Sequence, residues 1–201
     1  MEPFIHGFLL AFGLILPLGV QNVFVFSQGA QQTRLVRALP ATIMASLSDT
    51  FLILLAVLGI SVIVSEVEQL KMLLMSAGVL FLLYMSFTMW KAKPELHGNT
   101  EGLSIKKQII FALSVSLLNP HAILDTIGVI GTSALSYAGT EKVIFTATCI
   151  FVSWCWFIGL TLAGSIFKRL DGSGKMLGII NKCSAIFIFL TACWLIRDLV
   201  S

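Results

Sequence analysis

Long apolar stretches alternate with short polar segments along the whole chain. A helix needs about 20 mostly apolar residues to cross a hydrocarbon core of roughly 30 Å. The stretches that meet this length are Phe4–Phe26, Leu39–Val64, Leu70–Trp90, Ile109–Tyr137, Val143–Phe167 and Met176–Ile196. They lack the ten-residue alternating pattern typical of a membrane β-barrel. The pattern therefore predicts an all-α, polytopic membrane protein with six transmembrane helices.

Composition strengthens this prediction. Only 11% of the 201 residues are charged and 57% are hydrophobic, and the mean hydropathy is +0.96. Soluble domains carry roughly 25% charged residues, because so much of their surface is wet. The values exclude a typical soluble enzyme, a disordered chain and a coiled coil. The net charge of +3 comes without a long basic run, so no nucleic-acid partner is expected.

The longest polar segment, residues 91–107, divides the predicted spans into two sets of three. Aligning Pro17 with Pro120 places Asn22 opposite Asp125, and each half then opens with a span interrupted by proline. A repeat of three spans must insert its second copy upside down, and inverted repeats with broken helices are a recurrent transporter plan. We therefore predict one membrane domain over 1–201, made of a three-helix repeat (1–93), a cytoplasmic linker (94–106) and an inverted second repeat (107–201).

Lysine and arginine positions predict the orientation. The linkers after the first, third and fifth predicted spans carry most of the cations, namely Arg34, Arg37, Lys91, Lys93, Lys106, Lys107, Lys168, Arg169 and Lys175. The opposite face carries Lys71, Lys142 and Arg197. Because cytoplasmic loops are enriched in Lys and Arg, the first face is expected in the cytoplasm, with both termini outside it. The first span has no cleavage-site pattern and is expected to be retained.

Two proline motifs are expected to break helices inside the membrane. Proline cannot donate a backbone N–H and clashes with the preceding turn. Asn119 and Pro120 suit the cap and first position of a restarted helix, and Gly19 follows Pro17 where another backbone can come close. Each restart leaves free N–H groups and the positive end of a helix dipole, which favour a carboxylate. The alternative is an ordinary proline kink.

Buried charges give the strongest functional signal. Asp49 lies near the middle of the second predicted span, and Asp125 lies in the fourth. A central aspartate costs about 2.5–3.5 kcal/mol to insert, so it tends to face an interior cavity or a proton path. His121 precedes Asp125 by one helical turn, so the pair could share or relay a proton. The structural alternatives are a hydrogen bond between helices for Asp49 and a fixed salt bridge for His121–Asp125. Lys182 is expected to extend to the cytoplasmic surface.

Neutral polar residues near the breaks are further candidates. Gln21, Asn22 and Ser153 could bind a ligand or form hydrogen bonds between helices. Trp154 and Trp156 flank this part of the fifth span, and one of them is expected to line a cavity. The four cysteines form no C-x-x-C pair and are expected to be small buried hydrophobic residues. No thiol or histidine cluster has metal-ligand spacing, and no cofactor is expected.

These motifs resemble one family. The run from Pro17 to Asn22, the Ser48–Asp49 pair, and Asn119-Pro120-His121 followed by Asp125 are similar to the LysE-type exporters, most closely the lysine/arginine branch. The resemblance covers essentially the full chain. It implies a multi-pass bacterial inner-membrane protein that exports L-lysine, L-arginine or related compounds, driven by the proton motive force or the membrane potential. It also implies a homo-oligomer.

The residue chemistry agrees with that implication. Asp49 and Asp125 could bind the positive groups of a cationic amino acid, and the restarted helices after Pro17 and Pro120 could bind its carboxylate. Protonation of either aspartate or of His121 would weaken cation binding and couple export to inward proton flow. The sequence leaves other functions open, namely export of neutral amino acids or of a metal cation, and a membrane redox protein. An intramembrane enzyme lacks a supporting nucleophile–base motif.

Overall fold

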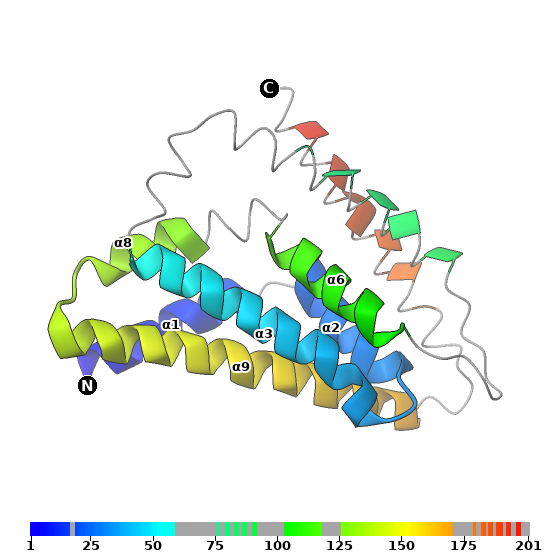
Figure 1. Ribbon diagram of the computed structural model, residues 1–201, viewed down its shortest axis with the longest axis horizontal. Coiled ribbons are helices and arrows are strands. Elements are labelled where there is room, and N and C mark those ends of the chain that lie inside the picture. The colour runs from blue at the N-terminus through cyan, green and yellow to red at the C-terminus, as the bar shows by residue number, and fades with distance from the viewer. Residues whose placement is uncertain are drawn as a thin grey trace.

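A computed structural model of the chain describes residues 1–16, 19–58, 103–117 and 126–170, with separate positions between 76 and 91 and between 179 and 197. All regular elements in these segments are helical. The elements are α1 (Glu2–Ile15), α2 (Val20–Gln31), α3 (Leu35–Val57), α6 (Ile105–Leu117), the π-helix η1 (Thr126–Ile130), α8 (Gly131–Ala134) and α9 (Gly139–Leu170). Figure 1 shows α3 and α9 side by side along the longest axis, with α1 and α2 behind them.

The first predicted span is broken, as the proline pattern indicated. α1 ends at Ile15, α2 begins at Val20, and the two helices meet at an angle of 79°. Gly19 is the N-cap of α2, with φ −78° and ψ 169°. Pro17 lies outside the described residues. This extended backbone at Gly19 ends one helix direction and lets the chain start another.

The second and fifth predicted spans are single helices. α3 begins at Leu35, before the expected Leu39, and accommodates Pro40 inside the helix. α9 runs from Gly139 to Leu170 and extends beyond both ends of the expected span. Among the described residues, these are the two helices long and apolar enough to cross a membrane, and a third span is counted if the bent α1–α2 pair is one span.

The remaining spans are described only in part. α6 ends at Leu117, and the predicted break at Asn119 and Pro120 lies outside the described residues, as do His121 and Asp125. The third and sixth spans are represented by single helical positions. Val79, Ala185 and Ile188 are buried in one apolar core with residues of α2, α3, α6 and α9. The six-span count, the domain boundaries and the inverted repeat stay predictions.

Contacts at the two ends of the molecule give the helix directions. At one end, the His6 Nδ1 lies 2.8 Å from the Tyr137 hydroxyl, so α1 and α9 begin together. At the other end, Lys168 Nζ donates to the Gln32 carbonyl at 2.8 Å, so α2 and α9 finish together. Gln32 also reaches the Leu103 carbonyl, just before α6 begins. α3 and α6 therefore run opposite to the first and fifth spans, the alternation expected of consecutive crossings.

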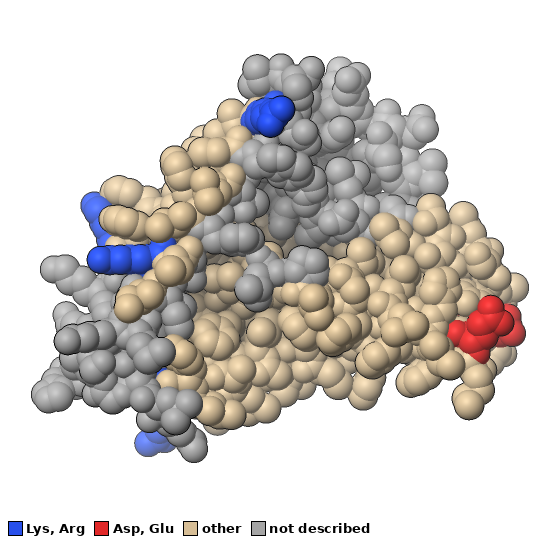
Figure 2. Space-filling model, turned by 180° about the vertical axis from the view of Figure 1, so that it is seen from behind, with Lys and Arg blue, Asp and Glu red and all other residues tan. Residues whose placement is uncertain are grey.

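Most of the described cations lie toward one end of this axis, and Lys142, in the first turn of α9, lies toward the other end. Arg34, Arg37, Lys106, Lys107 and Lys168 belong to the helix ends that these contacts bring together, and we call this the cationic end. The acidic residues of the first turns of α1 and α9 lie at the opposite end. On the face shown in Figure 2, acidic side chains lie at one end and most basic ones toward the other. The described cations of the linkers predicted to share one membrane face thus lie toward one end.

Outward positions of the long helices are apolar. Beyond the first turn of α3, its exposed side chains recur at helical spacing and are Ile43, Leu47, Phe51 and Leu54. α9 exposes a comparable set, including Phe151, Ile158 and Leu162. A soluble domain rarely exposes such continuous apolar faces, whereas a lipid-facing helix requires them.

Two glycines allow a close helix crossing between α2 and α9. A Cβ added to Gly164 on α9 would overlap the Phe26 carbonyl oxygen of α2, and one added to Gly29 would overlap the Thr161 carbonyl oxygen. Small residues let backbones approach in this way in membrane helix pairs. The distal half of the broken span is therefore held against α9 by backbone-to-backbone packing.

We predict that Gly164→Ala destabilises the protein by about 1–3 kcal/mol, because the new methyl group meets backbone that cannot move alone. Gly159→Ala, on the same helix, is the matched control, because a Cβ added there meets nothing within 4 Å. Thermal unfolding of the detergent-purified chain should show a lower Tm for Gly164→Ala and an equal or higher Tm for Gly159→Ala. Equal Tm values for both variants would contradict the close crossing.

Candidate functional site

Asp49 is the acidic group at the centre of the packed helices. It is partly buried on α3, and its two carboxylate oxygens have different partners. Gln21 Nε2 on α2 donates to Oδ1 at 3.2 Å, and Ser153 Oγ on α9 donates to Oδ2 at 2.8 Å. Both donors are neutral, and Asp49 forms no ion pair within the described part of the chain. The carboxylate is thus held in place by residues of three helices, and none of its described partners carries a positive charge.

The break in the first span positions one of these donors. Because α2 starts at Val20, Gln21 lies in its first turn, where its amide reaches both Asp49 and the Ala45 carbonyl. The first N–H groups of a helix have no intrahelical acceptors, and they carry the positive end of the helix dipole. Asp49 therefore lies near a helix start that favours negative charge.

Asn22 connects the two halves of the broken span. It is buried, with 5% of its surface exposed. Its Nδ2 donates to the Ile15 carbonyl at 2.7 Å, which satisfies an acceptor at the end of α1. Its Oδ1 accepts from Trp156 Nε1 of α9 at 3.2 Å. One amide side chain therefore connects α1, α2 and α9 at the bend.

Two tryptophans support this region from α9. Trp154 Nε1 donates to Thr50 Oγ1 at 3.1 Å, directly beside the Asp49–Ser153 contact. Trp156 packs edge-on against Phe12 of α1, with ring centroids 5.7 Å apart. Both indoles follow Ser153 closely in sequence; Trp154 contacts α3, and Trp156 contacts the bend. Farther along α9, the Thr161 hydroxyl lies 2.7 Å from the Thr42 hydroxyl of α3.

The structure brings together four of the residues that the sequence singled out. Gln21, Asp49 and Ser153 are in direct contact, and Asn22 lies in the same first turn of α2, next to Gly19. The other predicted site residues, Pro17, Asn119, Pro120, His121 and Asp125, lie outside the described residues. Their roles and the relation of the two halves stay predictions.

Sequence reasoning underestimated the tryptophans. That one of Trp154 and Trp156 lines a cavity stays a prediction, and both donate hydrogen bonds in this region. The role of the Ile15 carbonyl as acceptor for Asn22 was not foreseen. The available signal was the proline break itself, since a broken helix leaves carbonyls that need donors. Lys182 is exposed, as expected for a lysine that leaves the apolar interior.

The described residues give little support for metal binding or cysteine chemistry. No group of three or more His, Cys, Asp or Glu side chains that could hold a metal ion occurs among them. All four cysteines are free, and Cys149 alone is buried. The prediction of buried cysteines is therefore wrong for Cys155, Cys183 and Cys193, which are exposed on helices whose outward faces are apolar.

Replacing Asn22 should weaken the bend more than replacing its tryptophan partner. Asn22→Leu leaves the Ile15 carbonyl and the Trp156 N–H without this partner, and each such buried group costs about 1–3 kcal/mol. Trp156→Phe keeps most of the ring and removes one donor. In a double-mutant cycle measured by denaturant unfolding in detergent, the Asn22→Leu/Trp156→Phe variant should lose less than the sum of the single changes. Strict additivity would contradict the contact.

Comparison with known proteins places the chain in a family. The model of the LysE type translocator family matches residues 12–199. YisU of Bacillus subtilis (strain 168), a candidate amino-acid transporter, is 56% identical over 96% of this chain and 88% of its own length. The arginine exporter protein ArgO of Salmonella typhimurium (strain LT2) is 33% identical over 97% of this chain and 93% of its own length. No solved structure matches. The chain therefore belongs to the LysE type translocator family.

Proposed function

We propose that this protein is a secondary transporter that exports basic amino acids, L-lysine and L-arginine, across the bacterial inner membrane. The observation that carries the proposal is the Asp49 carboxylate, which three helices hold at the centre of the fold with neutral donors and no described counter-ion. A carboxylate in a low-dielectric interior gains most from a cation. The arginine exporter among the relatives supports the same substrate class.

The surroundings of Asp49 suit both ends of such a substrate. The ammonium or guanidinium group would bind Asp49, with Gln21 and Ser153 keeping its oxygens in place. The substrate carboxylate would bind the free N–H groups at the start of α2, beyond Gly19. Asn22 contributes by maintaining the break that exposes those groups. Asn119 would play the corresponding part at the restart after Pro120.

Coupling to protons completes the proposed mechanism. A proton that neutralises Asp49 or Asp125 would release a bound cation, and inward proton movement would then drive outward substrate movement. His121 would pass the proton to or from Asp125. The cationic end of the helices would face the cytoplasm by the positive-inside rule, with both termini on the other side. We further propose two inverted repeats and a homo-oligomer in the lipid bilayer.

We expect Asp49→Asn to lower the affinity for lysine and arginine roughly 30-fold or more, because a neutral amide cannot pair with the substrate cation. The measurement is efflux from cells loaded with dipeptides of lysine, arginine, threonine or leucine, with and without the protein. Ser153→Ala should cause a smaller loss, since it removes one donor to the carboxylate and keeps the charge. Glu141→Gln is the control, because that exposed acid lies in the first turn of α9, away from Ser153.

This experiment also separates the substrate classes. Export of lysine and arginine that depends on Asp49 supports the proposal. Threonine or leucine export in the wild type, with lysine and arginine retained in the cells, would show a neutral amino-acid exporter instead. Undiminished arginine efflux by Asp49→Asn at limiting substrate would remove Asp49 from the binding site.

Proton coupling is tested separately in proteoliposomes. Asp125→Asn should abolish the acceleration of lysine efflux by an imposed pH gradient, because the variant side chain takes up no proton. Efflux without the gradient should persist in this variant if Asp49 still binds the substrate. Full, pH-gradient-driven efflux by Asp125→Asn would rule out the coupling role of Asp125.

A further inference from the structure

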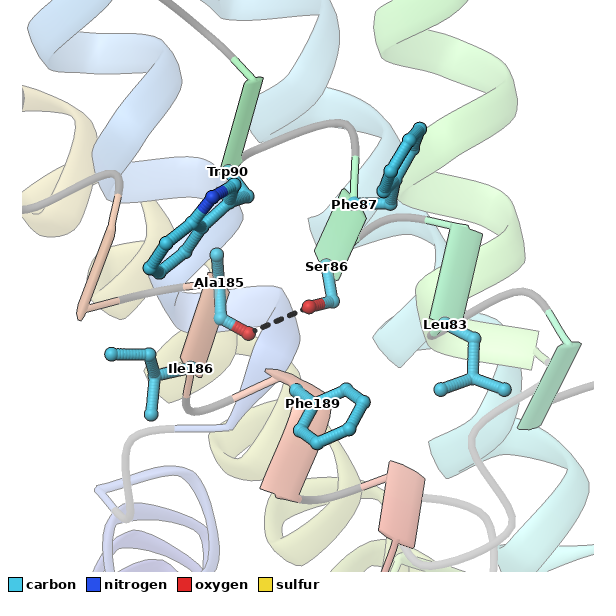
Figure 3. Close-up of a pocket in the computed structure, with 7 residues that line it drawn as sticks. All are labelled: Leu83, Ser86, Phe87, Trp90, Ala185, Ile186 and Phe189. Carbon is cyan, nitrogen blue, oxygen red and sulfur yellow. Dashed lines mark hydrogen bonds between the residues drawn. The ribbon is translucent and has the colours of Figure 1, made fainter.

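A second feature lies away from Asp49, between the described positions of the third and sixth predicted spans. Here a groove of about 360 Å³ is lined by Leu83, Ser86, Phe87, Trp90, Ala185, Ile186 and Phe189. Its volume lies in the range of small-molecule sites, about 300–1,000 Å³. Figure 3 shows the large side chains arranged around a central contact between Ser86 and Ala185. We propose that this groove binds the acyl chain of an anionic phospholipid whose headgroup contacts Lys91 and Lys182.

The shape of the groove suits a hydrocarbon chain. Ser86 and Ala185 are small and buried and form the floor, whereas Phe87, Trp90, Ile186 and Phe189 are about half exposed and form the rim. The polar side chain of the floor already has a partner, because the Ser86 hydroxyl donates to the Ala185 carbonyl at 2.9 Å. A ligand in the groove therefore meets apolar surface and needs no hydrogen-bonding groups there.

Charge at one end of the groove specifies the headgroup. Lys91 Nζ lies 4.1 Å from the centroid of the Phe87 ring, and Lys182 Nζ lies 6.0 Å from that of the Trp90 ring. Both lysines are exposed, so their ammonium groups remain available to a phosphate. Tryptophan favours the depth of lipid headgroups, and basic pockets between membrane helices bind anionic headgroups.

A lipid fits these features better than a second copy of this chain. The two lysines require an anionic partner beside the apolar rim, and the first-turn acids of α1 and α9 lie at the opposite end of the helices. A phospholipid supplies its charge and its apolar chain at the required ends of one molecule. This proposal does not depend on what the protein exports.

Native mass spectrometry of the purified full chain tests the proposal, with dioleoyl phosphatidylglycerol and dioleoyl phosphatidylcholine as probes. The wild type should retain the anionic lipid preferentially. Lys91→Gln/Lys182→Gln should reduce that preference by about fivefold per lysine, and Lys91→Arg/Lys182→Arg should preserve it. Lys106→Gln/Lys107→Gln is the matched control, because it removes two exposed charges of the cationic end outside the groove.

A second pair of variants tests the apolar contact. Phe87→Ala/Phe189→Ala should reduce retention of both lipids while leaving the thermal stability near the wild-type value, since both rings lie on the exposed rim. An unchanged preference for phosphatidylglycerol in Lys91→Gln/Lys182→Gln would overturn the proposal. So would a change from dimer to monomer in the rim variant with lipid retention unaltered, because that result would assign the groove to a second copy.

Discussion

The break in the first span creates a requirement that organises the centre of this protein. A helix that stops inside a membrane leaves backbone groups that lipid cannot hydrate, and protein groups must bind them. Asn22 does so for the Ile15 carbonyl, and Trp156 of α9 holds Asn22 in turn. The same break starts α2 at Val20 and thereby places Gln21 beside Asp49. The bend and the surroundings of Asp49 therefore depend on the same helix break.

Close packing of α2 against α9 makes this arrangement possible. The glycine contacts between α2 and α9 leave no space for a Cβ on either side, so the distal half of the broken span follows α9 closely. α9 then supplies Ser153 to Asp49 and Trp154 to Thr50 within one turn of each other. A long straight helix serves as the frame against which the bent helix and α3 are aligned. Asp49 and Ser153 lie within α3 and α9, whereas Gln21 and Asn22 lie in the first turn of α2.

Much of this could be read from residue patterns because the membrane imposes strong rules. The length of apolar runs predicted α3, α9 and the bent first span, and the expense of a central charge singled out Asp49. Pro17 and Gly19 indicated the break. The helix boundaries were harder to predict. α3 begins before Leu39 because helix formation continues past the apolar run into the interfacial residues. The two tryptophan hydrogen bonds depend on helix rotation, which apolar periodicity specifies poorly when both faces are hydrophobic.

The sequence by itself determined the membrane setting, the helical class, the broken first span and the identity of the central acid. Each of these follows from the local sequence and from the fixed thickness of the hydrocarbon core of the bilayer. Only the tertiary structure decided which donors reach the Asp49 oxygens, that Asn22 bridges the break, and that a lysine-flanked groove lies between two distant segments. The reason is that such contacts join residues many positions apart, and their distances are set by helix crossing and rotation rather than by spacing along the chain.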